Sequence, residues 1–457
     1  MSYFVLKKLG IYQFLYTLCI LLLLIYLALN VTEPGDRGAA LPLLVGFVSI
    51  TCILILVQIL QSFLHTRIHW VFIIFLGLIG WLSLRITLDL HDTYQLKQVV
   101  VGTTGGVFLF FLLGNLSKRG LDSITTYWRS YVGAKLVVIL FFILSYLIHS
   151  ELSQRSMRLD VFLIEDIDGN YQRAGNFIII MFLMVSYLVI KIMSYNNIKK
   201  HFEWLLWLSV YTIGFIFFLI SSQRLGSNGA AFNLVVVYFL TIVVSILALN
   251  SRLRQDFLQS KPLLLLSRRW LKLFFLVTIC SCAILVIAGA TLIYVSGFDI
   301  YTTRAFGFGD GGNSSIESRF KILMDTGLAQ IGYSPLFGNV DVARLTTGDA
   351  GEMLHNFFPN IFAELGVIGL AIVVSLFYMV FKEILKGIHN TNFTSSGFQK
   401  SIIHIWLFYI FLFLIFYANI AVGKSWIVMW FFVGLSVNVF VFNKKSSVSA
   451  KQRGLTI

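Results

Sequence analysis

The stretch IYQFLYTLCILLLLIYLALNV, residues 11–31, contains no charged side chain. It is long enough to cross a lipid bilayer as one helix, for which about 20 apolar residues suffice. Lys7 and Lys8 precede it, and no small-residue cleavage motif follows its apolar core. We therefore predict a retained signal anchor that leaves the N-terminus in the cytoplasm.

The rest of the chain has the same character. Of its 457 residues, 58% are hydrophobic and 12% are charged, and the mean hydropathy is +0.85. Soluble globular proteins carry about 25% charged residues, so that class is excluded. The apolar runs predict an all-α polytopic membrane protein with about twelve transmembrane helices. They lie near residues 11–31, 41–64, 70–90, 98–117, 132–149, 176–195, 203–221, 229–249, 271–296, 360–381, 402–422 and 426–442.

The formal net charge of +14 is accounted for by this topology. With the N-terminus inside and an even number of spans, both termini are cytoplasmic and most of the 35 Lys and Arg residues lie on the cytoplasmic side. The outer side is then net negative. The basic surplus faces anionic lipid, so no nucleic-acid partner is needed to explain it.

We predict one integral membrane domain over residues 1–457 with two long outer segments and a cytoplasmic tail at 443–457. The smaller outer segment is 151–175, and the larger is 297–359, between the ninth and tenth spans. Loops longer than about 15 residues in a compact domain are usually functional or disordered. The larger loop contains FKILMDTGLAQIGY, residues 320–333, whose apolar residues fall near helical spacing and predict a helix.

Cations are scarce on the outer side, and two arginines and a histidine stand out there. Arg224 lies between two apolar spans, and its guanidinium could clamp phosphate through two hydrogen bonds or reach lipid headgroups as an interfacial residue. Arg319 has the same phosphate-binding chemistry, with an ion pair to Glu317 or Asp325 as the alternative. His355 titrates near neutrality, so it is either a structural residue or an acid/base group at the membrane surface.

Other residues around His355 have simpler interpretations. Asn356 could cap the helix that begins near Pro359, and Glu364 could be favoured by the dipole of that helix. The chain has no phosphate-binding glycine loop, zinc-protease motif or nucleophile elbow, and its outer acidic residues match no metal-site spacing, so we predict neither metal nor cofactor. Arginine and histidine without paired carboxylates suit a leaving group that is already a stabilised diphosphate.

The order of these elements resembles the O-antigen ligase and polymerase family of bacterial inner-membrane glycosyltransferases. The resemblance rests on Ser222-Gln223-Arg224 followed by Gly226, on Ser318-Arg319 followed by Pro335-Leu336-Phe337-Gly338, and on His355-Asn356 followed by Glu364-Leu365-Gly366 and Gly369. It covers residues 220–370. The chain departs from the family pattern where Leu225 separates arginine from glycine, and where Asn339-Val340 follow a glycine that usually belongs to Gly-x-Gly.

The resemblance implies a GT-C-like fold and metal-independent transfer of a glycan from an undecaprenyl diphosphate carrier to a sugar hydroxyl. The reaction would take place at the periplasmic face of the bacterial inner membrane. By this likeness, Arg224 and Arg319 bind the diphosphate, and His355 orients or deprotonates the acceptor hydroxyl. The further candidate substrate-binding residues are Asn356, Tyr171, Arg173, Arg344 and Glu364.

Within the family we expect a polymerase that joins repeat units into O-antigen or capsular polysaccharide, because segment 151–175 resembles an additional glycan-facing loop of the polymerase branch. The alternative is an O-antigen ligase that transfers the finished glycan to the lipid A core of lipopolysaccharide. A transporter or flippase for lipid-linked sugars is the alternative outside the family, although charged residues well inside the spans are scarce. Expected partners are the undecaprenyl-diphosphate-linked glycan and membrane lipids, with a chain-length regulator and a flippase as candidate protein partners.

Overall fold

The computed structural model describes residues 2–32, 37–61, 66–90, 100–127, 132–155, 170–194, 201–225, 227–253, 315–348, 353–389, 395–438 and 440–442. Over these residues the chain is helical apart from short connections and one two-stranded ribbon. The helices are α1 (Ser2–Thr32), α2 (Arg37–Gln61), α3 (Trp70–Asp89), η1 (Val100–Gly105, a π-helix), α5 (Gly106–Tyr127), α6 (Val132–Arg155), α7 (Asn170–Ser194), α8 (His201–Arg224), α9 (Asn228–Leu253), α11 (Ser315–Tyr333), α12 (Val342–Thr347), α13 (Phe357–His389), α14 (Ser395–Ala421) and α15 (Ile427–Ser436), and the strands are β1 (Thr66–Ile68) and β2 (Phe440–Phe442).

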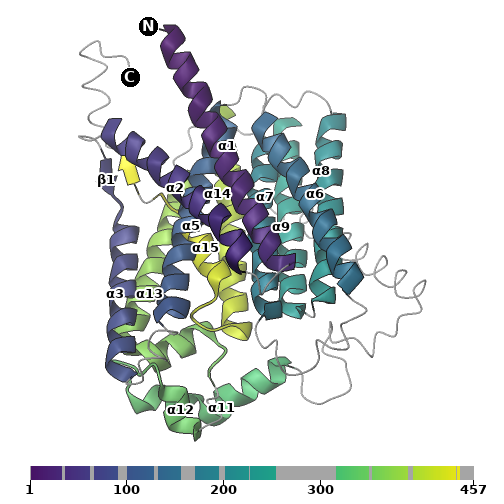
Figure 1. Ribbon diagram of the computed structural model, residues 1–457. Helices are drawn as coiled ribbons and strands as arrows, with labels where there is room; N and C mark the ends of the chain where they lie inside the picture. Colours follow the sequence, from purple (N-terminus) through teal and green to yellow (C-terminus); the bar gives the residue numbers. More distant parts are fainter. Residues whose placement is uncertain are drawn as a thin grey trace, which may run out of the picture.

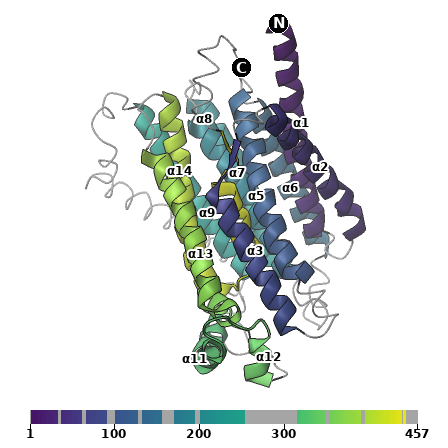
Figure 2. The same cartoon turned by 90° about the vertical axis from the view of Figure 1, so that its left-hand side faces the viewer.

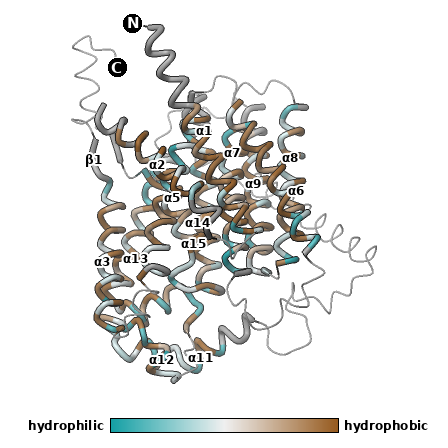
Figure 3. The backbone as a smooth tube through the Cα atoms, viewed as in Figure 1, coloured by the Kyte–Doolittle hydropathy of each residue, from teal (hydrophilic) through white to brown (hydrophobic). Residues whose placement is uncertain are grey.

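Eight helices in the described part of the chain are long and apolar enough to cross a membrane. Hydrophobic residues run along α3, α6 and α13 in Figure 3. Each of the eight overlaps a predicted span, so the predicted class, an all-α polytopic membrane protein, is confirmed. The eight segments are Phe14–Thr32, Trp70–Asp89, Val132–Gln154, Gln172–Ser194, Glu203–Arg224, Gly229–Ala248, Phe357–Ile388 and Ser401–Ile420.

The other four predicted spans have different outcomes. The run 41–64 lies largely in α2, whose apolar stretch Pro42–Leu54 is short, and the run 98–117 corresponds to η1 and the first half of α5. The run 271–296 lies outside the described residues. The prediction of a helix over 426–442 is wrong in extent, because α15 has 10 residues and the chain then forms β2. A helix of that length spans about 15 Å, roughly half of a bilayer's hydrocarbon core.

The early end of α15 is explained by its contacts with α5. The side-chain amide of Asn115 donates to the carbonyl of Val437 at 2.7 Å, and the ammonium of Lys118 donates to the carbonyl of Ser436 at 3.1 Å. These donors satisfy carbonyls that a helix end leaves without partners. Gly114 and Gly434 also allow the two backbones to touch, since a Cβ on either would lie within 2.0 Å of a carbonyl oxygen of the other helix.

The bundle is built around α7, since 94% of the most apolar stretch of this helix is buried. A helix that is hydrophobic on all sides belongs in an interior, and α7 packs against α1, α9 and α14. Helices α6 and α8 pair on one side of it, whereas α3 and α13 pair on the other (Figures 1 and 2). Apolar side chains on the outer faces of α3, α6 and α8 are exposed, as expected for helices that face lipid.

The two ends of the bundle differ in structure. At one end β1 and β2 form an antiparallel ribbon, with Thr66 opposite Phe442 and Ile68 opposite Phe440. At the other end α11 and α12 lie beneath the bundle (Figure 1). We call these the ribbon end and the α11 end. The ribbon places the connection before α3 and the segment after α15 at the same end, as the predicted topology requires.

The predicted loops are partly described. The larger loop, 297–359, contains α11 and α12, so the predicted helix over 320–333 is confirmed. Of the predicted smaller loop, 151–175, residues 151–155 belong to α6 and 170–175 to α7, and residues 156–169 lie outside the described residues. Residues 443–457, the predicted tail, lie outside the described residues.

Candidate functional site

Every candidate site residue predicted from the sequence belongs to an element at the α11 end. Helix α8 ends at this end of the bundle, α7 and α13 begin there, and α11 and α12 lie beneath its α13 side (Figure 1). Arg224 is the last residue of α8, Tyr171 and Arg173 lie in the first turn of α7, Arg319 lies in α11, Arg344 in α12, His355 and Asn356 before α13, and Glu364 in its first part.

A buried ion pair joins Glu364 and Lys424 at this end of the bundle. Glu364 is on α13, and Lys424 is in the turn between α14 and α15. The side chains are 2% and 9% exposed, respectively. Asn360 bridges both residues, because its amide nitrogen donates to Glu364 Oε1 at 2.6 Å and its Oδ1 accepts from the backbone N–H of Lys424 at 3.0 Å. Trp430 Nε1 donates to the carbonyl of Lys424 at 2.7 Å, which fixes the other side of the turn.

A second polar contact holds the segment that carries His355. The amide nitrogen of Asn356 donates to the carbonyl of Asn419, near the end of α14, at 2.6 Å. Asn419 Oδ1 in turn accepts from the backbone N–H of Phe358 at 3.1 Å, which satisfies one free donor of the first turn of α13. Asn356 Oδ1 is buried and has no hydrogen-bond partner in the described residues. His355 itself is exposed.

Helix α13 is broken at Gly366, where φ is 67° and ψ is −171°. In an unbroken helix the N–H of Val367 would donate to the carbonyl of Ala363. Instead Val367 donates to the carbonyl of Pro335 at 2.9 Å, and the carbonyl of Ala363 accepts from Asn339 at 3.1 Å. The loop after α11 therefore inserts into the break and replaces the lost helical hydrogen bonds. Irregular backbone at membrane depth is tolerated where protein covers it in this way.

Two glycines make the insertion sterically possible. Gly338, with φ of 71°, and Gly366 face each other so closely that a Cβ on Gly366 would lie 2.3 Å from the carbonyl oxygen of Leu336. A Cβ on Gly338 would lie 2.4 Å from the backbone nitrogen of Gly366. The resemblance motifs Pro335-Leu336-Phe337-Gly338 and Glu364-Leu365-Gly366 are thus the two sides of one backbone crossing.

The last turn of α3 anchors the inserted loop. Arg85 pairs with Asp89 and also donates to the carbonyl of Gly338 at 2.8 Å. Asp89 Oδ2 accepts from the backbone N–H of Val340 at 2.8 Å. Trp81 Nε1 donates to the carbonyl of Leu365 at 3.0 Å, directly beside the break.

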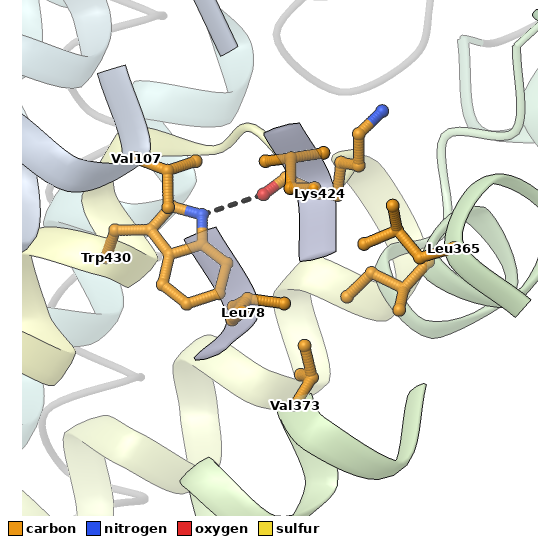
Figure 4. Close-up of a pocket in the computed structure, with 8 residues that line it drawn as sticks. Leu78, Val107, Leu365, Val373, Lys424 and Trp430 are labelled. Carbon is orange, nitrogen blue, oxygen red and sulfur yellow. Dashed lines mark hydrogen bonds between the residues drawn. The ribbon is translucent and has the colours of Figure 1, made fainter. Parts of the chain in front are cut away.

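A small apolar pocket lies between this crossing and α15, lined by Leu78, Leu82, Val107, Ile361, Leu365, Val373, Lys424 and Trp430. The aliphatic stem of Lys424 lines the pocket, and its ammonium points away from the Trp430 ring (Figure 4). A long basic side chain can bury its stem among apolar groups while its head finds a polar partner. The head of Lys424 finds Glu364.

Arg224 is not part of this network. Helix α8 lies on the opposite side of the bundle from α3 and α13 (Figure 1). Arg224 lies close enough to His149 of α6 for the two side chains to interact electrostatically, and its Nη1 is buried without a hydrogen-bond partner in the described residues. Arg173, in the first turn of α7, has its guanidinium 5.5 Å from the ring centroid of Phe177.

The remaining candidates are less constrained. Arg344 is 57% exposed and forms an ion pair with Asp341, with Nη2 at 2.7 Å from Oδ2. For Arg319 and Tyr171 the structure describes the helical backbone but no side chain. The structure thus places Asn356 and Glu364 in two polar contacts near the start of α13 and leaves Arg224 at a separate position on the same end of the bundle.

Sequence reasoning missed the most buried cation of the site, Lys424. The signal was present, because Lys424 is a lone cation in a short connection between two apolar stretches on the cation-poor side. The same argument had singled out Arg224. Asn360 and Asn419 carried no recognisable sequence signal, since an asparagine near a helix end usually indicates a cap.

The described residues include no group of three His, Cys, Asp or Glu side chains that could hold a metal ion. The fold and the polar end together define a multi-pass helical membrane protein with a buried, partly charged site at one end of its bundle.

A comparison with protein-family models finds no matching family, and a comparison with curated proteins finds no significant match.

Proposed function

We propose that the protein is a glycosyltransferase of the bacterial inner membrane that joins undecaprenyl-diphosphate-linked repeat units into O-antigen or capsular polysaccharide. One observation supports this proposal above the others. The candidate residues, from five helices and the segment before α13, occur at the same end of the bundle, the end where α11 and α12 lie. A reaction between two lipid-linked glycans needs such a site, with cations for a diphosphate and a titratable group at the membrane surface.

The proposed reaction gives roles to His355 and to the candidate arginines. The acceptor hydroxyl attacks the anomeric carbon of the donor, a new glycosidic bond forms, and undecaprenyl diphosphate leaves with the bonding electrons. His355, which is exposed, accepts the hydroxyl proton. By the resemblance, Arg224 and Arg319 are assigned to the charge on the departing diphosphate, although Arg224 lies across the bundle from the Glu364–Lys424 pair. Arg344 and Arg173 contact sugar or phosphate groups in this scheme.

The ion pairs of two charged residues within the spans weigh against the transporter alternative. Arg85, in the apolar run 70–90, and Lys135, in the run 132–149, are the nearest candidates for a polar path through the bilayer. Arg85 pairs with Asp89 and the inserted loop, and Lys135 pairs with Glu203. Both side chains thus have local structural partners, which favours a site at one end over a path through the bundle.

Reconstitution into liposomes tests the proposal. The purified protein is given lipid-linked repeat units extracted from its own source cells, with and without lipid A core. Longer lipid-linked glycans in the absence of lipid A core indicate the polymerase. Glycan transfer that requires lipid A core indicates the ligase, and movement of the substrate across the bilayer without a new bond indicates the transporter.

Two variants connect the activity to the site. His355→Gln removes the proton acceptor, and we expect elongation to fall by about 10²–10⁴-fold, the usual contribution of general base catalysis. Lys386→Met is the matched control, because Lys386 lies at the far end of α13 in an exposed ion pair with Glu383. Normal elongation by His355→Gln would exclude His355 from the reaction.

A further inference from the structure

The Glu364–Lys424 pair places two ionisable side chains in the protein interior, where charged groups are rare. Removing two charges from solvent is costly, and apolar replacements of a buried pair are often as stable or more stable. Intramembrane ionisable residues that face a bundle interior commonly serve function. Stability alone therefore does not account for this pair at the α11 end.

Glu364 and Lys424 differ in how many of their hydrogen-bonding groups have partners. Both oxygens of Glu364 are used, since Oε1 accepts from Asn360 and Oε2 accepts from Lys424. The ammonium of Lys424 has three N–H groups, and Glu364 is its one acceptor among the described residues. Glu364 would keep a hydrogen bond from Asn360 if the ammonium moved away.

The backbone of Lys424 is fixed independently of its head group. Asn360 accepts from its N–H, and Trp430 donates to its carbonyl. The ammonium can change its partner through side-chain rotation, with no movement of the α14–α15 turn. Figure 4 shows the stem of Lys424 beside the apolar lining and the ammonium beyond it.

The turn that carries Lys424 lies against the segment that carries His355. A Cβ on Gly423 would lie 3.8 Å from the carbonyl oxygen of Leu354, and Asn356 bonds to Asn419 just before the turn. The unpartnered Oδ1 of Asn356 is buried in the same region and can accept a hydrogen bond from a ligand hydroxyl. The ammonium of Lys424 and the candidate proton acceptor therefore belong to adjacent segments.

We propose that Lys424 is a donor-binding residue whose ammonium exchanges Glu364 for the diphosphate of the lipid-linked donor. This inference rests on the proposed function and adds Lys424 to the cations proposed for the diphosphate, at a position across the bundle from Arg224. Glu364 holds the ammonium in position while the site is empty. The diphosphate, which carries more negative charge than one carboxylate, then competes for it.

The exchange predicts unequal effects of removing the two partners. Lys424→Met removes the cation and should weaken diphosphate binding at least tenfold. Glu364→Gln keeps the hydrogen bond from Asn360 but removes the competing charge, so binding should be unchanged or tighter. In the double variant, apolar and neutral groups replace the pair, so stability should return toward the parent value while binding stays weak.

Calorimetric titration of the detergent-solubilised full chain with undecaprenyl diphosphate measures these affinities, and thermal unfolding measures stability. The Lys386→Met and Glu383→Gln variants are matched controls from the exposed pair on the same helix, and neither should change the affinity. Phosphatidylglycerol in the same micelles tests for a general lipid headgroup site, and its binding should not depend on Lys424.

Several results would overturn the inference. Equal weakening by Lys424→Met and Glu364→Gln, or parent affinity in a stable double variant, would make the pair purely structural. Absence of binding to the parent chain, or an equal dependence of phosphatidylglycerol binding on Lys424, would remove the diphosphate assignment. Lys424-dependent diphosphate binding without glycan elongation would instead refute the proposed polymerase and retain the binding site.

Discussion

The substitution Gly366→Ala tests the backbone crossing that shapes the site. An alanine here would adopt a φ of 67° with ψ of −171°, a conformation that costs about 1–3 kcal/mol for residues other than glycine. Its Cβ would lie 2.3 Å from the carbonyl oxygen of Leu336, so the inserted loop would have to move away. Moving it breaks the bonds from Val367 to Pro335 and from Asn339 to Ala363, each worth about 0.5–1.5 kcal/mol. We expect an overall loss of about 2–6 kcal/mol.

Equilibrium unfolding by SDS in mixed micelles, followed by tryptophan fluorescence, measures this loss. Gly80→Ala is the control, because Gly80 lies in helix α3 and a Cβ added there would have no atom within 4 Å. That substitution should be neutral or stabilise α3 by roughly 0.5–1 kcal/mol. If Gly366→Ala unfolds at the same SDS fraction as Gly80→Ala, the proposed crossing of the loop and the broken helix is refuted.

Three further predictions concern other parts of the structure. Arg344→Ala removes an exposed ion pair, so stability should stay within about 1 kcal/mol of the parent while elongation falls, and unchanged elongation would exclude it from substrate binding. Asp89→Ala removes the acceptor for the inserted loop, so hydrogen exchange should rise at residues 338–340, and unchanged protection would contradict the anchoring role. Thr66→Cys with Phe442→Cys should form a disulfide on oxidation, whereas Thr66→Cys with Phe440→Cys should not, and equal yields would refute the ribbon register.

The sequence predicts the long apolar helices well because their signal is local. A run such as 70–90 needs no tertiary partner to be recognised, since length and hydropathy suffice. The end of α15 depends on partners far away in sequence. Residues 426–442 are apolar throughout most of their length, yet side chains of α5 cap the helix at Ser436. Hydropathy carries no information about such a cap.

The sequence indicated which segments form the candidate site, but it did not reveal the contacts between them. The motifs at 335–338 and 364–366 were both recognised, but their meeting at one backbone crossing could not be inferred, because an inserted loop leaves no periodic signal. Gly366 lies within the apolar run 360–381, where hydropathy predicts an unbroken helix, and it is instead a helix break. Lys424 shows the opposite case, in which the charge was visible in the sequence and its buried partner was not.

The ribbon has a consequence for the order in which the molecule is completed. Strand β1 is synthesised before all the helices from α3 onward, whereas β2 follows α15. Throughout the intervening synthesis, β1 lacks its partner and its edge groups are open to other strands or to water. The ribbon can therefore form only after the later helices have been made, so its closure marks a late step in the assembly of the bundle.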